Sequence, residues 1–200
     1  MITYDDATHT YLNDGKKWPS VTQVMQCVGL SDYSHIPEHV LRYAAERGTI
    51  VHAMTEMIDD NDLDMDSVME ELRGYADAYT KFLDDHTCYI PYSEEMVYSK
   101  KLRYCGRLDR VIRFADKRNY IVDLKCTSSQ LPAHRVQLAA YKHAWEEMGH
   151  KIDGAKSLYL RGDGTYNIVD HSNITSSEML TFVSALNVWW WKERNDLNKG

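Results

Sequence analysis

Three side chains with the potential for chemistry, Asp109, Asp123 and Lys125, fall within one short region of the chain. Two carboxylates on neighbouring strands repel each other unless a positive charge lies between them, and such hard oxygen ligands suit Mg²⁺ or Mn²⁺. A lysine beside the ion can hold an attacking water and neutralise charge that develops on a phosphate. These residue types indicate a metal-dependent hydrolytic site. The alternative is a surface hairpin with a solvated Asp–Lys pair.

An antiparallel hairpin is expected to carry these side chains. Residues 104–114 and 120–126 are rich in Tyr, Val, Ile, Leu and Phe, which is typical of strands, and the segment between them is short and polar. Asp123 and Lys125 are separated by a single residue, so their side chains point to the same face of the strand. With the turn in the polar segment, Asp109 lies opposite Lys125 to within about two residues.

The other segments alternate between helical and strand-like patterns, which indicates an α/β fold with a central mixed β-sheet flanked by helices. Ser20 with Gln23, and Thr175 with Glu178, form capping-box patterns that mark two helix starts. Gly48 is expected to break its helix or to allow a close backbone approach, because a helix-interior glycine costs roughly 1 kcal/mol relative to alanine. Expected helices cover residues 21–28, 37–58, 68–85, 132–148 and 176–194. Expected strands, besides the central hairpin, are a short N-terminal hairpin at 2–12 and strands at 94–100, 155–160 and 165–170.

Length and composition favour one domain. The 200 residues, of which 44% are hydrophobic, are enough for one substantial core. We expect a single domain over 1–200, with an N-terminal hairpin and helical wall over 1–90, a catalytic sheet and helix over 91–170, and a C-terminal helix over 171–200. No apolar run approaches the roughly 18 residues of a membrane span, and no signal-peptide pattern opens the chain, so we expect a cytoplasmic protein.

The charge is unevenly distributed. A net charge of −7 counts against a non-specific coat for nucleic acid. However, much of the acid lies in residues 59–71, while residues 100–118 hold a run of lysines and arginines. A locally basic region in an acidic protein fits a phosphate-bearing substrate at a confined site, and the alternative is a charged solvent face. The four cysteines lack CxxC spacing, which argues against a zinc ribbon or an iron–sulfur cluster.

Five motifs follow one another along the chain in an order and spacing that match a known family. They are Arg47-Gly48-Thr49-x-Val51-His52, Glu94 before a strand, Gly106-Arg107-Leu108-Asp109, Asp123-Leu124-Lys125, and Gln137-x-x-x-Tyr141. On these motifs the chain resembles the PD-(D/E)xK nuclease superfamily, in particular its RecB-like exonuclease branch, which is often found in phages. The resemblance implies a restriction-endonuclease-like core with an N-terminal helical region. Leu108 stands where the nominal motif has proline, and the cysteine cluster of iron–sulfur members is absent.

The resemblance also implies roles for the central hairpin. Asp109 and Asp123 would bind one or two Mg²⁺ or Mn²⁺ ions, with the backbone carbonyl of Leu124 as a further ligand. Lys125 would position the attacking water and stabilise the charge of the transition state. These implied roles agree with the chemistry expected from the residue types alone.

Two upstream residues would complete the metal shell. By spacing alone, His52 and Glu56 are an i, i+4 pair of the kind usually found on a solvated face or as a satisfied core histidine. The resemblance makes His52 a metal ligand and leaves Glu56 as a lesser candidate behind it. As a ligand His52 must be neutral, so metal affinity is expected to fall below about pH 6.5. Glu94 would sit near the metal, with Glu95 as its competitor because adjacent strand residues point to opposite faces.

The remaining implied residues contact the lysine or the DNA. Gln137 and Tyr141 would orient Lys125 or bind the phosphate backbone. Arg107, Arg110 and Arg135 are predicted to contact nucleic acid. The expected activity is metal-dependent hydrolysis of DNA, exonucleolytic and serving DNA recombination or repair, with any recombination or helicase partner a separate protein because no helicase motif is present. The alternatives are a catalytically silent DNA-binding or assembly module of the same fold, and a hydrolase of small phosphate esters.

Overall fold

A computed structural model describes residues 2–5, 10–30, 36–127 and 129–198. The helices are α1 (Val21–Cys27), α2 (Glu38–Asp59), the short 3-10 helix η1 (Met65–Ser67), α3 (Glu70–Asp85), α4 (Pro132–Glu147) and α5 (Ser176–Arg194). The strands are β1 (Ile2–Asp5), β2 (Thr10–Asn13), β3 (Lys16–Trp18), β4 (Cys88–Ser99), β5 (Tyr104–Phe114), β6 (Asn119–Lys125), β7 (Gly154–Leu160) and β8 (Tyr166–Asp170). Both capping boxes are present, at the starts of α1 and α5. Among the described residues, no helix has both the length and the apolar character that a membrane crossing requires.

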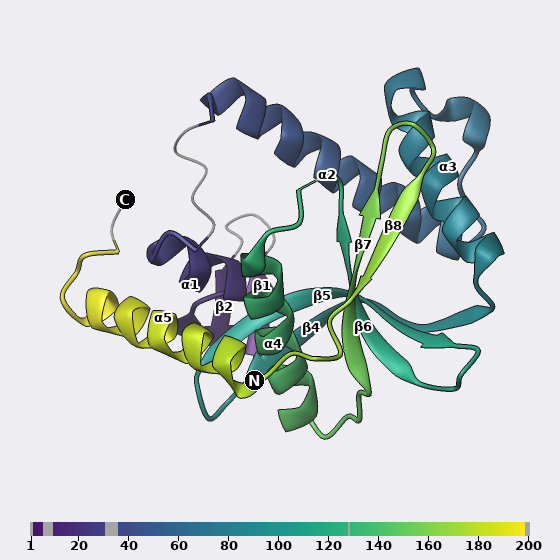
Figure 1. Cartoon of the computed structure of the whole chain (residues 1–200). Coiled ribbons are helices and arrows are strands. Elements are labelled where there is room, and N and C mark those ends of the chain that lie inside the picture. The colour runs from purple at the N-terminus through teal and green to yellow at the C-terminus, as the bar shows by residue number, and fades with distance from the viewer. Residues whose placement is uncertain (1, 6–9, 31–35, 128, 199–200) are drawn as a thin grey trace.

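The main sheet has five strands in the order β4-β5-β6-β7-β8 (Figure 1). All neighbours are antiparallel except β6 and β7, which run parallel and are joined through α4. The prediction of a mixed sheet flanked by helices is therefore confirmed. The expected β5–β6 hairpin also forms, and its pairing of Arg110 with Val122 places Asp109 and Asp123 level with each other where the ladder ends.

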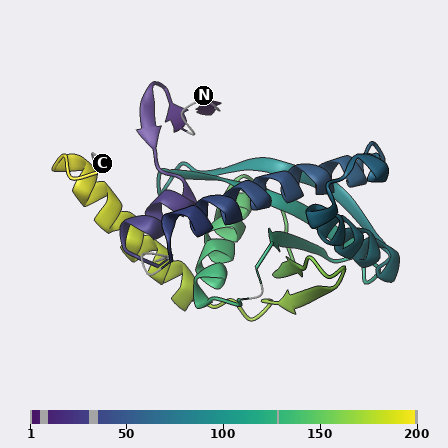
Figure 2. The same cartoon turned by 90° about the horizontal axis from the view of Figure 1, so that it is seen from above.

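Helices cover both faces of the sheet because its strands are apolar on both sides. One core packs β5 and β6 against α1, α4 and α5, and it buries Val24, Leu138 and Phe182. The other packs the sheet against α2 and α3, and it buries Val51 and Tyr79. Figures 1 and 2 show the corresponding grouping, with α5 beside α1 and α4, and α2 beside α3. Successive side chains on β6 point to opposite faces of the sheet. Val122 and Leu124 enter the core on the side of α2 and α3, so Asp123, between them in the sequence, points to the other face.

The N-terminal segment forms a separate three-stranded antiparallel sheet in the order β1-β2-β3, rather than the simple hairpin expected over 2–12. Residues 6–9 of that expected hairpin lie outside the described residues. The small sheet is fastened to β5, because the Cys105 amide donates a hydrogen bond to the carbonyl of Pro19 at 2.9 Å. Tyr11, Trp18 and Cys105 are buried together at this junction.

Two expected boundaries differ from those observed. Helix α2 runs without a break through Gly48, where an added Cβ would meet nothing within 4 Å, so neither the expected break nor a close approach occurs. The penalty of one glycine is small beside the burial of Val51 and Met54 in the following turn. Strand β4 begins at Cys88 rather than at residue 94, and a register shift between Tyr89 and Tyr92 accommodates the extra length.

Candidate metal centre and active site

His52, Glu94 and Asp109 form a cluster in which each offers one ligand atom within 4.8 Å of the others. His52 Nδ1 lies 3.5 Å from Glu94 Oε1 and 3.8 Å from Asp109 Oδ1. The three residues come from α2 and from the middle of β4 and β5, so the cluster exists only because tertiary packing brings the helix against these two strands. All three side chains are partly exposed, which leaves the cluster open to an ion or a substrate.

The backbone of β4 directs Glu94 toward the cluster. The pairs Ser93–Arg110 and Glu95–Leu108 set a register in which Glu94 is level with Asp109. Glu94 has φ of 50°, a left-handed conformation that costs a non-glycine residue roughly 1–3 kcal/mol and concentrates at functional sites. Glu94 is therefore the carboxylate that reaches His52, and its predicted competitor Glu95 is not part of the cluster.

Arg110 forms an ion pair with Glu94 from the buried side of the cluster. Its side chain is fully buried, and its Nη1 lies 3.3 Å from Glu94 Oε1. Its Nε donates to Asp59 Oδ2 at 2.7 Å, and its Nη2 donates to Thr55 Oγ1 at 3.0 Å. Such burial leaves no surface for the DNA contact predicted from the sequence. Arg110 instead links α2 to the metal cluster.

Asp109 and Asp123, the two carboxylates of the β5–β6 hairpin, have different partners. Asp109 Oδ2 accepts a hydrogen bond from the Leu124 amide at 2.6 Å, which ties the middle of β5 to the end of β6 beyond the last pair of their ladder. Asp123 lies outside the three-residue cluster; its side chain is 2% exposed, and its Oδ2 is 2.7 Å from Lys125 Nζ. Within the described part of the chain, the Lys125 ammonium is the one partner of this oxygen. A buried carboxylate oxygen with unused lone pairs, beside two carboxylates and an imidazole, fits the coordination preferences of Mg²⁺ or Mn²⁺.

Lys125 is held between β6 and α4. Its Nζ donates to Gln137 Oε1 at 3.0 Å, and Gln137 Nε2 donates to the Tyr141 hydroxyl at 3.2 Å. Gly106 leaves room for the ring of Tyr141, since a Cβ at position 106 would lie 2.6 Å from that ring. Burial by itself would lower the pKa of Lys125, but the carboxylates of Asp123 and Asp109 outweigh it and raise that pKa. Lys125 is thus a cation that can stabilise phosphate charge, and not a neutral base.

The other two predicted DNA-binding arginines have different surroundings. Arg107 is exposed and lines a cavity of about 480 Å³ together with His52 and Glu94. Arg135 instead pairs with Glu178 at 2.7 Å, and it lines a separate cavity between α4 and α5. The structure therefore brings Arg107 to the metal cluster and places Arg135 in the contact between two helices.

The carboxylates around His52 change its protonation. Burial lowers the pKa of His52, but Asp109 and Glu94 outweigh it and raise the pKa to about 9. Burial also raises the pKa of Asp109, to about 6. Without a metal, His52 is therefore an imidazolium at neutral pH and itself supplies the positive charge that the two carboxylates require.

This protonation predicts a pH-dependent metal affinity. Each ion that binds His52 must displace its proton, so affinity for Mn²⁺ is expected to rise roughly tenfold per pH unit from pH 6.5 to about 9. This pH range lies above pH 6.5, the value near which the metal affinity would change if His52 had the pKa of an ordinary histidine. In the metal-free protein the sign is opposite: the raised pKa contributes stability that is complete below pH 6.5 and lost as the pH rises through about 9. Calorimetric titration across this range measures the first effect.

A matched pair of variants isolates His52 in that titration. His52→Ala should bind Mn²⁺ more weakly than wild type and lose the pH dependence. His39→Ala, which changes an exposed histidine on the same helix, should retain both. Equal affinities in His52→Ala and wild type would remove His52 from the metal shell.

The mixed sheet therefore carries a His–Glu–Asp cluster that could hold a metal ion, beside a buried Asp–Lys pair, in an α/β fold. The family model of the PD-(D/E)XK nuclease superfamily matches residues 66–189, and the chain belongs to this superfamily. Membership indicates a metal-dependent nuclease, and it confirms the superfamily predicted from the five motifs.

Other comparisons add little. No curated protein matches the sequence. Among solved structures, the chain is similar to one titled "Crystal structure of SSO0001", with 14% identity over 81% of this chain and 75% of that chain. The TM-score of that match is 0.37, so it carries no argument about function.

Proposed function

We propose that this protein is a deoxyribonuclease of the RecB-like exonuclease branch that hydrolyses DNA phosphodiester bonds with Mg²⁺ or Mn²⁺. The observation that supports this most strongly is the convergence of His52, Glu94 and Asp109 on one side of the Asp123–Lys125 ion pair. A metal cluster and a buried cation side by side are what the charge of a phosphodiester transition state requires.

Each residue has a role in this proposal. His52, Asp109 and Asp123 would hold the ion, with the Leu124 carbonyl as a further ligand and Glu94 beside the same ion or a second one. When bound, the divalent ion supplies Lewis-acid stabilisation and an activated water. Lys125 would orient the attacking water and stabilise the negative charge on the phosphate oxygens.

Gln137 and Tyr141 act through Lys125. The Gln137 carbonyl oxygen accepts one of the three ammonium protons, so the remaining two are directed toward Asp123 and the reacting phosphate. Arg107, exposed at the rim of the same cavity, is placed to contact the phosphate backbone of the DNA. Any recombination or helicase partner would be a separate protein, and the enzyme would act in the cytoplasm, of a host cell if it is encoded by a phage.

Cleavage of end-labelled DNA tests the proposal. Single-stranded and duplex substrates are incubated with Mg²⁺, with Mn²⁺ or with EDTA, and the products are resolved by length. The expected result is stepwise shortening from an end in either metal and none in EDTA. Internal cuts in a closed circle would contradict the exonuclease assignment. Binding of DNA without cleavage in both metals would establish the catalytically silent module instead.

A further inference from the structure

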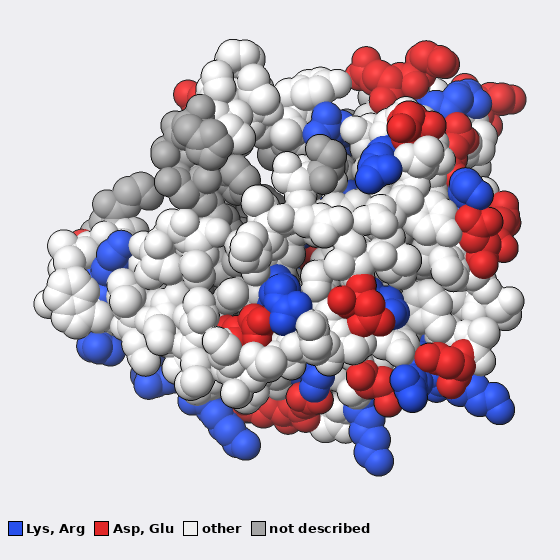
Figure 3. Space-filling model, viewed as in Figure 1, with Lys and Arg blue, Asp and Glu red and all other residues white. Residues whose placement is uncertain are grey.

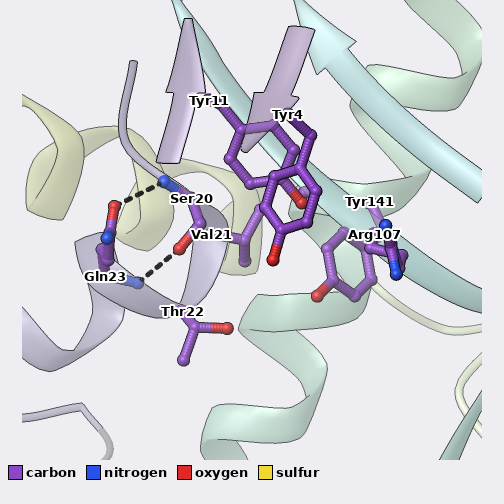
Figure 4. A pocket seen from close by; sticks show the side chains of 9 residues that line it. Tyr4, Tyr11, Ser20, Val21, Thr22, Gln23, Arg107 and Tyr141 are labelled. Atoms are coloured by element: carbon purple, nitrogen blue, oxygen red, sulfur yellow. Dashed lines mark hydrogen bonds between the residues drawn. The ribbon is translucent and has the colours of Figure 1, made fainter. Parts of the chain in front are cut away.

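A second cavity, of about 330 Å³, is lined in part by Tyr141, the last of the hydrogen-bonded residues Lys125, Gln137 and Tyr141. The proposed mechanism assigns no role to this cavity. The small N-terminal sheet, α1, β5 and α4 each contribute to its walls. Figure 4 shows Tyr4 and Tyr11 side by side, with Thr22 of α1 below them and Tyr141 of α4 to their right, beside Arg107. Its size is within the range of small-ligand sites, roughly 300–1,000 Å³.

The walls of this cavity are aromatic and cationic. The ring centroids of Tyr4 and Tyr11 are 4.7 Å apart, with an interplanar angle of 40°. The guanidinium carbon of Arg107 lies 5.0 Å from the centroid of the Tyr4 ring. Tyrosine rings and arginine planes are the surfaces on which unpaired bases stack. The combination favours a flat, aromatic ligand.

The cavity adjoins the active site at two points. Arg107 lines both this cavity and the cavity that contains His52 and Glu94. Tyr141 lines it too, and Tyr141 is joined through Gln137 to Lys125. A strand whose phosphate lies at the metal cluster could therefore place an adjacent base in this cavity.

The surrounding charge also fits a polynucleotide. The chain has a net charge of −7, yet β3, which pairs with β2, and the turn that leads into β5 carry exposed basic residues. Figure 3 shows acidic side chains gathered at the upper right, over the region of α3 in Figure 1. The exposed basic residues on β3 and on the turn between β4 and β5 are Lys16, Lys17, Lys100, Lys101 and Arg103.

We propose that the cavity between the N-terminal sheet and α4 binds one unpaired nucleobase of the DNA strand, next to the scissile phosphate. The inference rests on the proposed nuclease function and adds a determinant of substrate choice. A base within a duplex is stacked and paired, so it can enter only after it is extruded, at an energetic cost. The site therefore favours single-stranded DNA and frayed ends over blunt duplexes.

Binding of oligonucleotides that carry or lack one base tests this site. Single-stranded DNA with a single abasic position near its end is titrated against its intact counterpart by fluorescence anisotropy, with Ca²⁺ replacing Mg²⁺. Wild type should bind the intact strand roughly tenfold more tightly than the strand whose missing base would occupy the cavity. Tyr4→Ala should bind both strands equally, and with the lower affinity.

Two further variants control the experiment. Tyr89→Ala removes a tyrosine that is 63% exposed on β4 and outside the cavity, and it should keep wild-type discrimination. Thr22→Trp fills the cavity from α1 without altering the N-terminal sheet, so it should abolish discrimination even if Tyr4→Ala disturbs that sheet.

The outcomes separate this site from the proposed activity. Equal affinity of wild type for intact and abasic strands, at every abasic position, would overturn the nucleobase site while leaving cleavage intact. So would undiminished discrimination in Thr22→Trp. Discrimination in a protein that never cleaves DNA would retain the base site and reject the nuclease.

Discussion

Lys125→Ala is expected to lower the rate of metal-dependent DNA cleavage by roughly 10²–10³-fold, the usual cost of removing one preorganised group that stabilises transition-state charge. The structure makes Lys125 hard to replace. Its Nζ lies 2.7 Å from Asp123 Oδ2 and donates to Gln137 at 3.0 Å, so the ammonium is held at one position. The neighbouring carboxylates keep its pKa raised despite burial, so the charge is present throughout the neutral range. Single-turnover cleavage of end-labelled DNA measures the loss.

Folding and binding must be checked in the same variant. Loss of Lys125 leaves the buried Asp123 without its counter-charge, which destabilises the protein, so the assay belongs well below the melting temperature. Lys81→Ala is the matched control, because Lys81 is an exposed lysine on α3 whose partner is Asp85. It should cleave at the wild-type rate. Cleavage by Lys125→Ala within about threefold of Lys81→Ala would exclude a catalytic role for Lys125.

Arg110→Ala is expected to lower the free energy of unfolding by about 3 kcal/mol, the scale for removing one partner of a buried ion pair. The guanidinium contacts Asp59, Thr55 and Glu94, which come from α2 and β4. Asp59 also accepts a hydrogen bond from the Tyr79 hydroxyl at 2.8 Å, so the network extends to α3. Truncation would leave the largely buried carboxylate of Asp59 without its cation and would remove the anchor of the partly exposed Glu94. Urea denaturation at pH 7 measures the change.

Arg113 provides the control for Arg110 on the same strand. Arg113 is exposed and its Nε donates to Asn119 in an exposed hydrogen bond, so Arg113→Ala should change stability by no more than about 0.5 kcal/mol. Arg110→Lys keeps the charge but loses the planar guanidinium that donates to four acceptors, so its stability should lie between those of Arg110→Ala and Arg113→Ala. Arg110→Ala should also weaken Mn²⁺ binding, because Glu94 loses its anchor. Equal unfolding midpoints for Arg110→Ala and Arg113→Ala would show that the network contributes nothing.

Arg110 and Lys125 support opposite sides of one site. Arg110 holds Glu94 from the core between the sheet and α2, whereas Lys125 contacts Asp123 from the side of α4. The metal cluster therefore lies where both cores of the molecule meet the end of the β5–β6 hairpin. We expect substitutions in either core to reduce activity before they unfold the protein, since small displacements of the ligands are costly.

The sequence alone was sufficient to predict the β5–β6 hairpin and the class of fold. Their content of Tyr, Val, Ile, Leu and Phe predicts β5 and β6, and the two-residue period of a strand puts Asp123 and Lys125 on one face. Helical spacing likewise puts Gln137 and Tyr141 one turn apart, and in the structure Gln137 contacts Lys125 while Tyr141 contacts Gln137. These features depend on residues close together in the chain, where strand and helix periods hold whatever the tertiary contacts.

Only the tertiary structure decided which carboxylates meet and which arginine is buried. Glu94 enters the cluster instead of Glu95 because of the register of β4 and a left-handed backbone at that residue, neither of which a strand pattern encodes. Arg110 is two residues from the buried Ile112, so its side chain points to the same face of β5, which is a weak indication of burial. Its partner Asp59 lies 51 residues away in the sequence. The cavity lined by Tyr4 and Arg107 likewise joins distant segments. Long-range packing sets such positions, because a charge can be buried only where its partners from other elements are already present.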